Sequence, residues 1–152
     1  MCGIVAVVRR PGSRAVPDVG ALTEQLAAAL SLLGPTMDST EPVDVVRAVQ
    51  RAAAGVEGVD RQLRGTAGLR ALLAAGSTRP EGDEQGAPVD DLDRRGGQLE
   101  TAIARIERFL DAEGARFGSH IEAVNASLEQ LKDAVWASVS YTHLTLPTIY
   151  SV

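Results

Sequence analysis

Residues 99–110, LETAIARIERFL, and residues 121–137, IEAVNASLEQLKDAVWA, carry the most regular hydrophobic pattern in the chain. Large apolar residues recur in both stretches at steps of three and four: Leu99, Ile103, Ile106 and Leu110, then Ile121, Val124, Leu128, Leu131 and Val135. This spacing places them on one face of each of two amphipathic helices. Gly114 and Gly118 lie in the short connection, and such connections favour antiparallel neighbours. The sequence therefore predicts an antiparallel helical hairpin over residues 91–138.

The second helix of this hairpin has sequence signals at both ends. Ser119 and Glu122 have the S-x-x-E spacing of a capping box, which predicts that the helix begins there. We expect it to end near Trp136, because the tail VSYTHLTLPTIYSV (residues 139–152) differs abruptly in composition. This tail resembles the peptide obtained when a sequencing adapter is translated together with a gene. We therefore expect residues 139–152 to be a non-native tail and give its histidine, His143, no role; the alternative is a short irregular strand.

The apolar stripes of the hairpin contain no Asp, Glu or His at inward positions. This favours a structural or partner-binding hairpin over a metal or cofactor site, and we expect no metal and no cofactor. The stripes could pack on other helices of this chain or receive a partner helix. The pattern alone leaves both interpretations open.

Residues 17–76 also have a helical pattern. Asp18, directly after Pro17, supplies a helix start, and leucines follow at helical spacing as far as residue 33, where Gly34 and Pro35 end the pattern. Pro42 fits the first turn of the next helix, whose apolar face consists of Val45, Val46, Val49, Ala52, Ala53 and Val56. A shorter, glycine-interrupted helix follows in LRGTAGLRALLAAG. By composition, residues 77–90 are a flexible linker.

Composition excludes several classes of function. The 152 residues are enough for one domain, and the net charge of −5 with 3% aromatic residues argues against nucleic acid as a partner. No apolar run approaches the roughly 18 residues that a membrane span needs, so no membrane is expected as a partner either. A single cysteine cannot form an internal disulfide, which fits a reducing, cytoplasmic location.

That single cysteine, Cys2, directly follows Met1 and opens the apolar run CGIVAVVRR. The run predicts a buried β-strand over residues 1–10. Once Met1 is removed, Cys2 carries a thiol and an α-amine whose reference pKa values lie within about one unit of each other. The amine can then act as the general base for the thiol, which is the chemistry of an N-terminal nucleophile. Gly3 allows close backbone approach to the thiol.

The start MCGIVAVV resembles that of class II glutamine amidotransferases, an N-terminal-nucleophile family. The resemblance implies that Cys2 is the catalytic residue, attacking the side-chain amide of glutamine as substrate and releasing ammonia. It also implies an α+β parent domain in which two antiparallel sheets lie between helices. The helical stretches are similar to an insertion in glucosamine-6-phosphate synthase-like proteins, which implies amination of a sugar phosphate, fructose 6-phosphate, on further domains. Residues 17–76 would then belong to this insertion.

The chain also departs from the family pattern. It contains no Asn-Gly pair and only one convincing strand, so we expect an N-terminal fragment without glutaminase activity of its own. The fold class expected for these 152 residues is mainly α: one N-terminal strand, then amphipathic helices and the antiparallel hairpin. The alternative function is a small helical interaction module in which Cys2 is structural.

Overall fold

The computed structural model describes residues 14–39, 41–77 and 88–149. Over these ranges the chain forms five α-helices and no strand: α1 (Val19–Leu33), α2 (Pro42–Leu63), α3 (Gly65–Ser77), α4 (Pro88–Glu113) and α5 (Ile121–Ile149). Short 3-10 helices follow α1 at Gly34–Met37 and connect α4 to α5 at Gly114–Arg116 and Gly118–His120. The mainly α prediction is confirmed for this part of the chain. The strand predicted over residues 1–10 lies outside the described residues.

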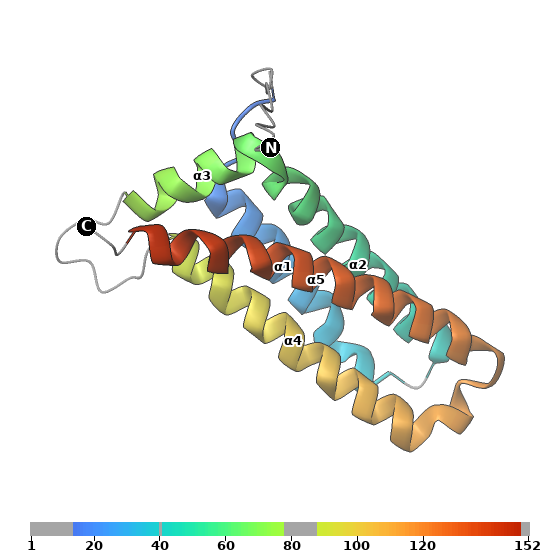
Figure 1. The fold of residues 1–152 in the computed structure, drawn as a ribbon. Helices are drawn as coiled ribbons and strands as arrows, with labels where there is room; N and C mark the ends of the chain where they lie inside the picture. The colour runs from blue at the N-terminus through green and yellow to red at the C-terminus, as the bar shows by residue number, and fades with distance from the viewer. Residues whose placement is uncertain (1–13, 40, 78–87, 150–152) are drawn as a thin grey trace, which may run out of the picture.

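The four longer helices lie along the length of the molecule and alternate in direction along the chain, so α1 and α4 run one way and α2 and α5 run the other (Figure 1). Helix α3 packs over one end of them. Helix α1 contacts α2 and α4, and α5 contacts the same two helices from the other side. The helices therefore form a four-membered ring in the order α1, α2, α5, α4. The α4–α5 hairpin is antiparallel, as expected, but α5 makes its most extensive contacts with α2.

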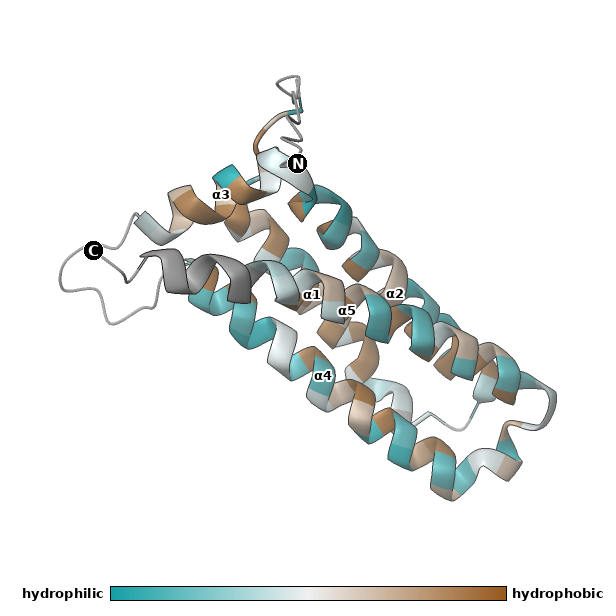
Figure 2. Cartoon of the chain, in the orientation of Figure 1, coloured by the Kyte–Doolittle hydropathy of each residue, from teal (hydrophilic) through white to brown (hydrophobic). Residues whose placement is uncertain are grey.

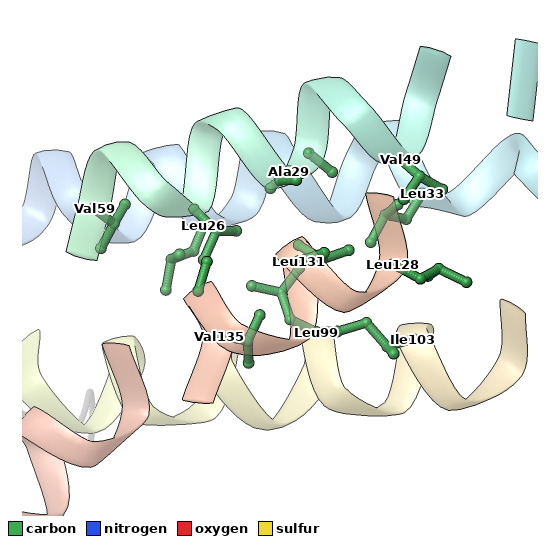
Figure 3. Close-up of a cluster of buried hydrophobic side chains, with 14 of the residues drawn as sticks. Leu26, Ala29, Leu33, Val49, Val59, Leu99, Ile103, Leu128, Leu131 and Val135 are labelled. Atoms are coloured by element: carbon green, nitrogen blue, oxygen red, sulfur yellow. The ribbon is translucent and has the colours of Figure 1, made fainter. Parts of the chain in front are cut away.

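One hydrophobic core joins helices from both halves of the sequence (Figure 3). Eight of the nine residues in the two apolar stripes are buried, and Ile121 is partly buried against them. The side chains that face the stripes come from α1 and α2: Leu22, Leu26, Ala29, Leu33, Val45, Val49, Val56 and Val59. The outer faces of α2 and α4 are largely hydrophilic, which is the two-sided pattern of bundle helices (Figure 2).

The start of α1 is fixed by two side chains. Asp18 is the N-cap, and its carboxylate accepts a hydrogen bond of 2.7 Å from the backbone N–H of Ala21. Arg14 donates from its guanidinium to the carbonyl oxygens of Arg61, Gln62 and Arg64, at 2.9, 2.6 and 2.6 Å. These carbonyls belong to the end of α2, where helical partners are lacking, so Arg14 holds the chain before α1 against that end.

A sharp corner between α2 and α3 depends on two glycines. Gly65 has φ of 78°, in the left-handed region that favours glycine. A Cβ on Gly68 would collide with the backbone of Leu63, carbonyl oxygen included. The corner turns α3 across the end of the bundle.

The structure corrects the predicted first residue of each of the two helices of the hairpin. Helix α4 begins at Pro88, inside the range predicted as a linker, because proline fits a first turn and Val89 is buried beside Leu92. Helix α5 begins at Ile121, after the 3-10 turn, and not at Ser119.

The predicted end of the second helix near Trp136 is wrong, because α5 continues to Ile149. Val139 and Tyr141 are partly buried against the core, and this packing extends the helix beyond the periodic stripe. Gly96 in α4 allows the approach, since a Cβ there would lie 2.5 Å from Cγ2 of Val139. The structure thus gives helical backbone, and no strand, to residues 139–149.

Within the described ranges, no helix combines the length and the apolar character needed to cross a membrane. Helices α4 and α5 are 26 and 29 residues long. Charged residues recur along α4 and along α5 as far as Asp133, on the faces turned away from the core.

Candidate functional site

The predicted catalytic residue, Cys2, lies outside the described residues, as does the whole segment 1–13. The first described residue is Arg14, which is bonded to the end of α2 beside the α2–α3 corner. The described residues form a helical bundle that buries its own core. The surface of this bundle has hollows that the sequence did not predict.

The larger hollow is a groove of about 390 Å³ between α4 and α5. Both helices contribute positions i, i+3, i+4 and i+7, which lie on one helical face. From α4 these are Glu100, Ile103, Ala104 and Glu107, and from α5 they are Glu129, Lys132, Asp133 and Trp136, with Val135 beside them. We call this hollow the α4–α5 groove. It is about 10 Å long, since seven residues of helix rise about 1.5 Å each.

An ion-pair network fixes the register of the two groove walls. Nζ of Lys132 lies 3.0 Å from Oε1 of Glu107 across the groove and 3.2 Å from Oε1 of Glu129 on its own helix. The hydrogen bond to Glu107 contributes most to raising the pKa of Lys132 above its usual value, followed by the one to Glu129. Lys132 is the only lysine in the chain, so no other lysine can replace it.

Trp136 stands in the same groove and is 73% exposed. Since α4 and α5 are antiparallel, and Lys132 pairs with Glu107, Trp136 lies one turn further along α5, level with Ile103. Ile103 and Val135 form an apolar floor but are only 4% and 2% exposed, so the exposed apolar surface of the groove is chiefly that of Trp136. An exposed indole beside an apolar floor is a common anchor of protein interfaces, where tryptophan is enriched.

The groove carries an excess of negative charge. Four of its lining residues are acidic and one is basic. Lys132 pairs with Glu107 and Glu129, whereas Glu100 and Asp133 have no ion-pair partner in the described part of the chain. The groove therefore presents two uncompensated carboxylates on opposite walls, next to an exposed aromatic ring.

A second hollow, of about 320 Å³, lies between α2 and α5. Its buried carboxylate belongs to Asp60, whose side chain is 5% exposed and whose Oδ2 lies 2.5 Å from Nη2 of Arg64. This hydrogen bond is the main cause that raises the pKa of Arg64 above its usual value. Oδ1 of Asp60 has no hydrogen-bond partner and almost no exposed surface, so a ligand in the hollow would not touch it. The pair ties together the last turn of α2, and we interpret it as structural.

Neither hollow brings together the groups needed for acyl transfer. Their linings contain no serine, cysteine or histidine, and the one histidine with a described side chain, His120, lies in the turn before α5. Among the residues that the structure describes, no group of three or more His, Cys, Asp or Glu side chains could hold a metal ion.

Comparisons with protein-family models, curated proteins and solved structures give no match for this chain. The α4–α5 groove is therefore interpreted from the geometry of the described residues alone. Sequence reasoning missed the α4–α5 groove because it followed only the buried stripes. The sequence signal that could have revealed the groove is the helical spacing of Glu129, Lys132, Asp133 and Trp136, which places one large aromatic residue on an otherwise charged helix face.

Proposed function

We propose that this chain is the N-terminal part of a class II glutamine amidotransferase in which Cys2 is the nucleophile. The observation that supports the proposal is the position of the sole cysteine, directly after Met1 and before Gly3 and an apolar run. On this proposal residues 1–10 form the nucleophile strand of an α+β parent domain. The cytoplasm is its proposed location, where a single thiol stays reduced.

The chemistry requires that Met1 be removed. The α-amine of Cys2 then takes the thiol proton, and the thiolate attacks the side-chain amide carbon of glutamine. Ammonia leaves after receiving a proton, and a glutamyl thioester remains. Water then hydrolyses the thioester and releases glutamate and the thiol. Ammonia passes to an acceptor, for which we propose fructose 6-phosphate, giving glucosamine 6-phosphate on further domains.

The described helices fit this proposal as an inserted unit. A bundle that buries its own apolar residues can interrupt another domain without exposing a core of its own. Arg14 supports such an attachment, since it holds the chain next to residues 1–13 at the end of α2.

The test uses the intact parent protein and measures glutamate release from glutamine. Cys2→Ser and Cys2→Ala are expected to abolish release, and a variant in which Met1 is retained should behave in the same way. Leu73→Ala, which shortens an exposed side chain on α3, is the control and should leave turnover unchanged. Full glutamine hydrolysis in either Cys2 variant would overturn the proposal. The 152-residue chain alone is expected to show no turnover.

A helical interaction module is the second candidate, favoured by the exposed Trp136 in the α4–α5 groove. The gene sequence beyond residue 138 separates the two candidates. Sheet-forming sequence with an Asn-Gly pair, followed by sugar-isomerase domains, would support the amidotransferase. A stop codon soon after residue 138 would support the interaction module.

A further inference from the structure

We propose that the α4–α5 groove binds an amphipathic helix of a partner protein whose apolar residues are flanked by arginine or lysine. This inference goes beyond the proposed function and does not rest on it, because every residue that it uses lies in α4 or α5. The partner has a stated chemistry: basic, helical and apolar on one face.

The shape of the groove is the first argument for a helical partner. Its two walls are nearly straight helix faces about two turns long, each supplying residues at i, i+3, i+4 and i+7. Partner helices commonly enter such grooves with anchors at the same spacing. Trp136 offers a large, exposed ring as an apolar anchor, and Ala104 is exposed on the opposite wall, whereas Ile103 and Val135 beneath them are almost completely buried.

Charge complementarity is the second argument, and it decides the chemistry of the partner. Glu100 on α4 and Asp133 on α5 lack an ion-pair partner in the described part of the chain, and four of the five charged lining residues are acidic. An acidic helix would be repelled by these groups, whereas arginine or lysine would pair with them. Arginine can also stack on the indole of Trp136 by a cation–π interaction.

Trp136 gives a direct measurement, because it is the only tryptophan in the chain. The probe is a tryptophan-free 16-residue peptide with leucine at i, i+3, i+4 and i+7 and arginine at the flanking positions. A matched peptide has glutamate at every arginine position. The basic peptide is expected to shift the emission of Trp136 to shorter wavelengths, since binding removes the indole from water. Its binding should weaken on the order of ten-fold between low and high salt.

Variants of the full chain test the assignment of the two carboxylates. Glu100→Gln and Asp133→Asn should each lower the affinity for the basic peptide about three-fold, as expected for an exposed charge pair. Glu122→Gln, an exposed acid on α5 outside the groove, is the matched control and should leave binding unchanged. Circular dichroism of each variant verifies that the fold is retained.

Three results would overturn the proposal. The first is an unchanged Trp136 emission with the basic peptide at millimolar concentration. The second is equal affinity for the acidic peptide. The third is a spermidine titration that reproduces the full effect of the basic peptide, because the groove would then bind a small polyamine and not a helix.

Discussion

Gly96 and Gly97 are neighbours in α4, yet alanine is expected to stabilise the fold at Gly97 only. In a helix interior, glycine to alanine contributes about 1 kcal/mol of stability. A Cβ on Gly97 meets nothing within 4 Å, so Gly97→Ala should show this full gain. A Cβ on Gly96 would lie 2.5 Å from Cγ2 of Val139, well inside the carbon–carbon contact distance of about 3.5 to 4.0 Å.

The expected cost of that clash is the cost of overpacking a core, about 1 to 3 kcal/mol. After the helix-propensity gain of about 1 kcal/mol, Gly96→Ala should range from neutral to about 2 kcal/mol destabilising. The two variants should therefore differ by about 1 to 3 kcal/mol. At about 2 to 4 °C per kcal/mol for a chain of this size, this is a difference of about 2 to 12 °C in Tm.

The assay is urea denaturation followed by circular dichroism, with Gly97→Ala as the matched control. The double variant Gly96→Ala/Val139→Ala should recover part of the loss, giving a coupling free energy of about 1 to 3 kcal/mol. If Gly96→Ala stabilised the chain as much as Gly97→Ala and showed no coupling to Val139, α5 would not pack on α4 beyond Ser138. The close approach of Val139 to Gly96 would then be refuted.

Two further predictions concern the core and the groove. Leu131→Ala should destabilise the chain by about 2 to 5 kcal/mol in urea denaturation, because Leu131 is fully buried. Trp136→Ala should stay within about 0.5 kcal/mol of wild type, because Trp136 is largely exposed. Equal losses of stability in the two variants would contradict the assigned orientation of α5. The folded-state pKa of Lys132 is raised, so its ion pairs stabilise the fold below the unfolded pKa of about 10.4 and this contribution is lost as pH rises through the folded value. Between pH 9 and 11.5 the wild type should thus lose more stability than Lys132→Gln, and parallel pH profiles would refute the network.

Helix-forming segments could be predicted because their signals are local. Asp18 is the cap of α1, Gly34 ends it, and Pro42 opens α2, as their positions predict. The two apolar stripes also predicted which side chains of α4 and α5 are buried, because the period of three and four residues fixes one face of a helix.

The candidate site was only partly accessible to the same reasoning. The chemistry at Cys2 follows from one residue that combines a thiol with an α-amine, and Cys2 lies outside the described residues. The α4–α5 groove, in contrast, needs residues 25 positions apart to face each other, as Glu107 and Lys132 do. A period of 3.6 residues determines which residues share a face, but it does not determine which other helix lies beside that face.

The sequence by itself therefore determined the helices between residues 17 and 138, their inward faces, and the unusual position of Cys2. Tertiary structure alone decided that α5 lies chiefly on α2, that α3 crosses the end of the bundle, and that α5 continues past Trp136. The physical reason is that hydrophobic burial is non-directional, so a stripe of leucines can pack on any complementary surface. Close packing selects among these surfaces: Val139 fits where Gly96 has no side chain, and that fit extends the helix through a segment whose local sequence does not predict it.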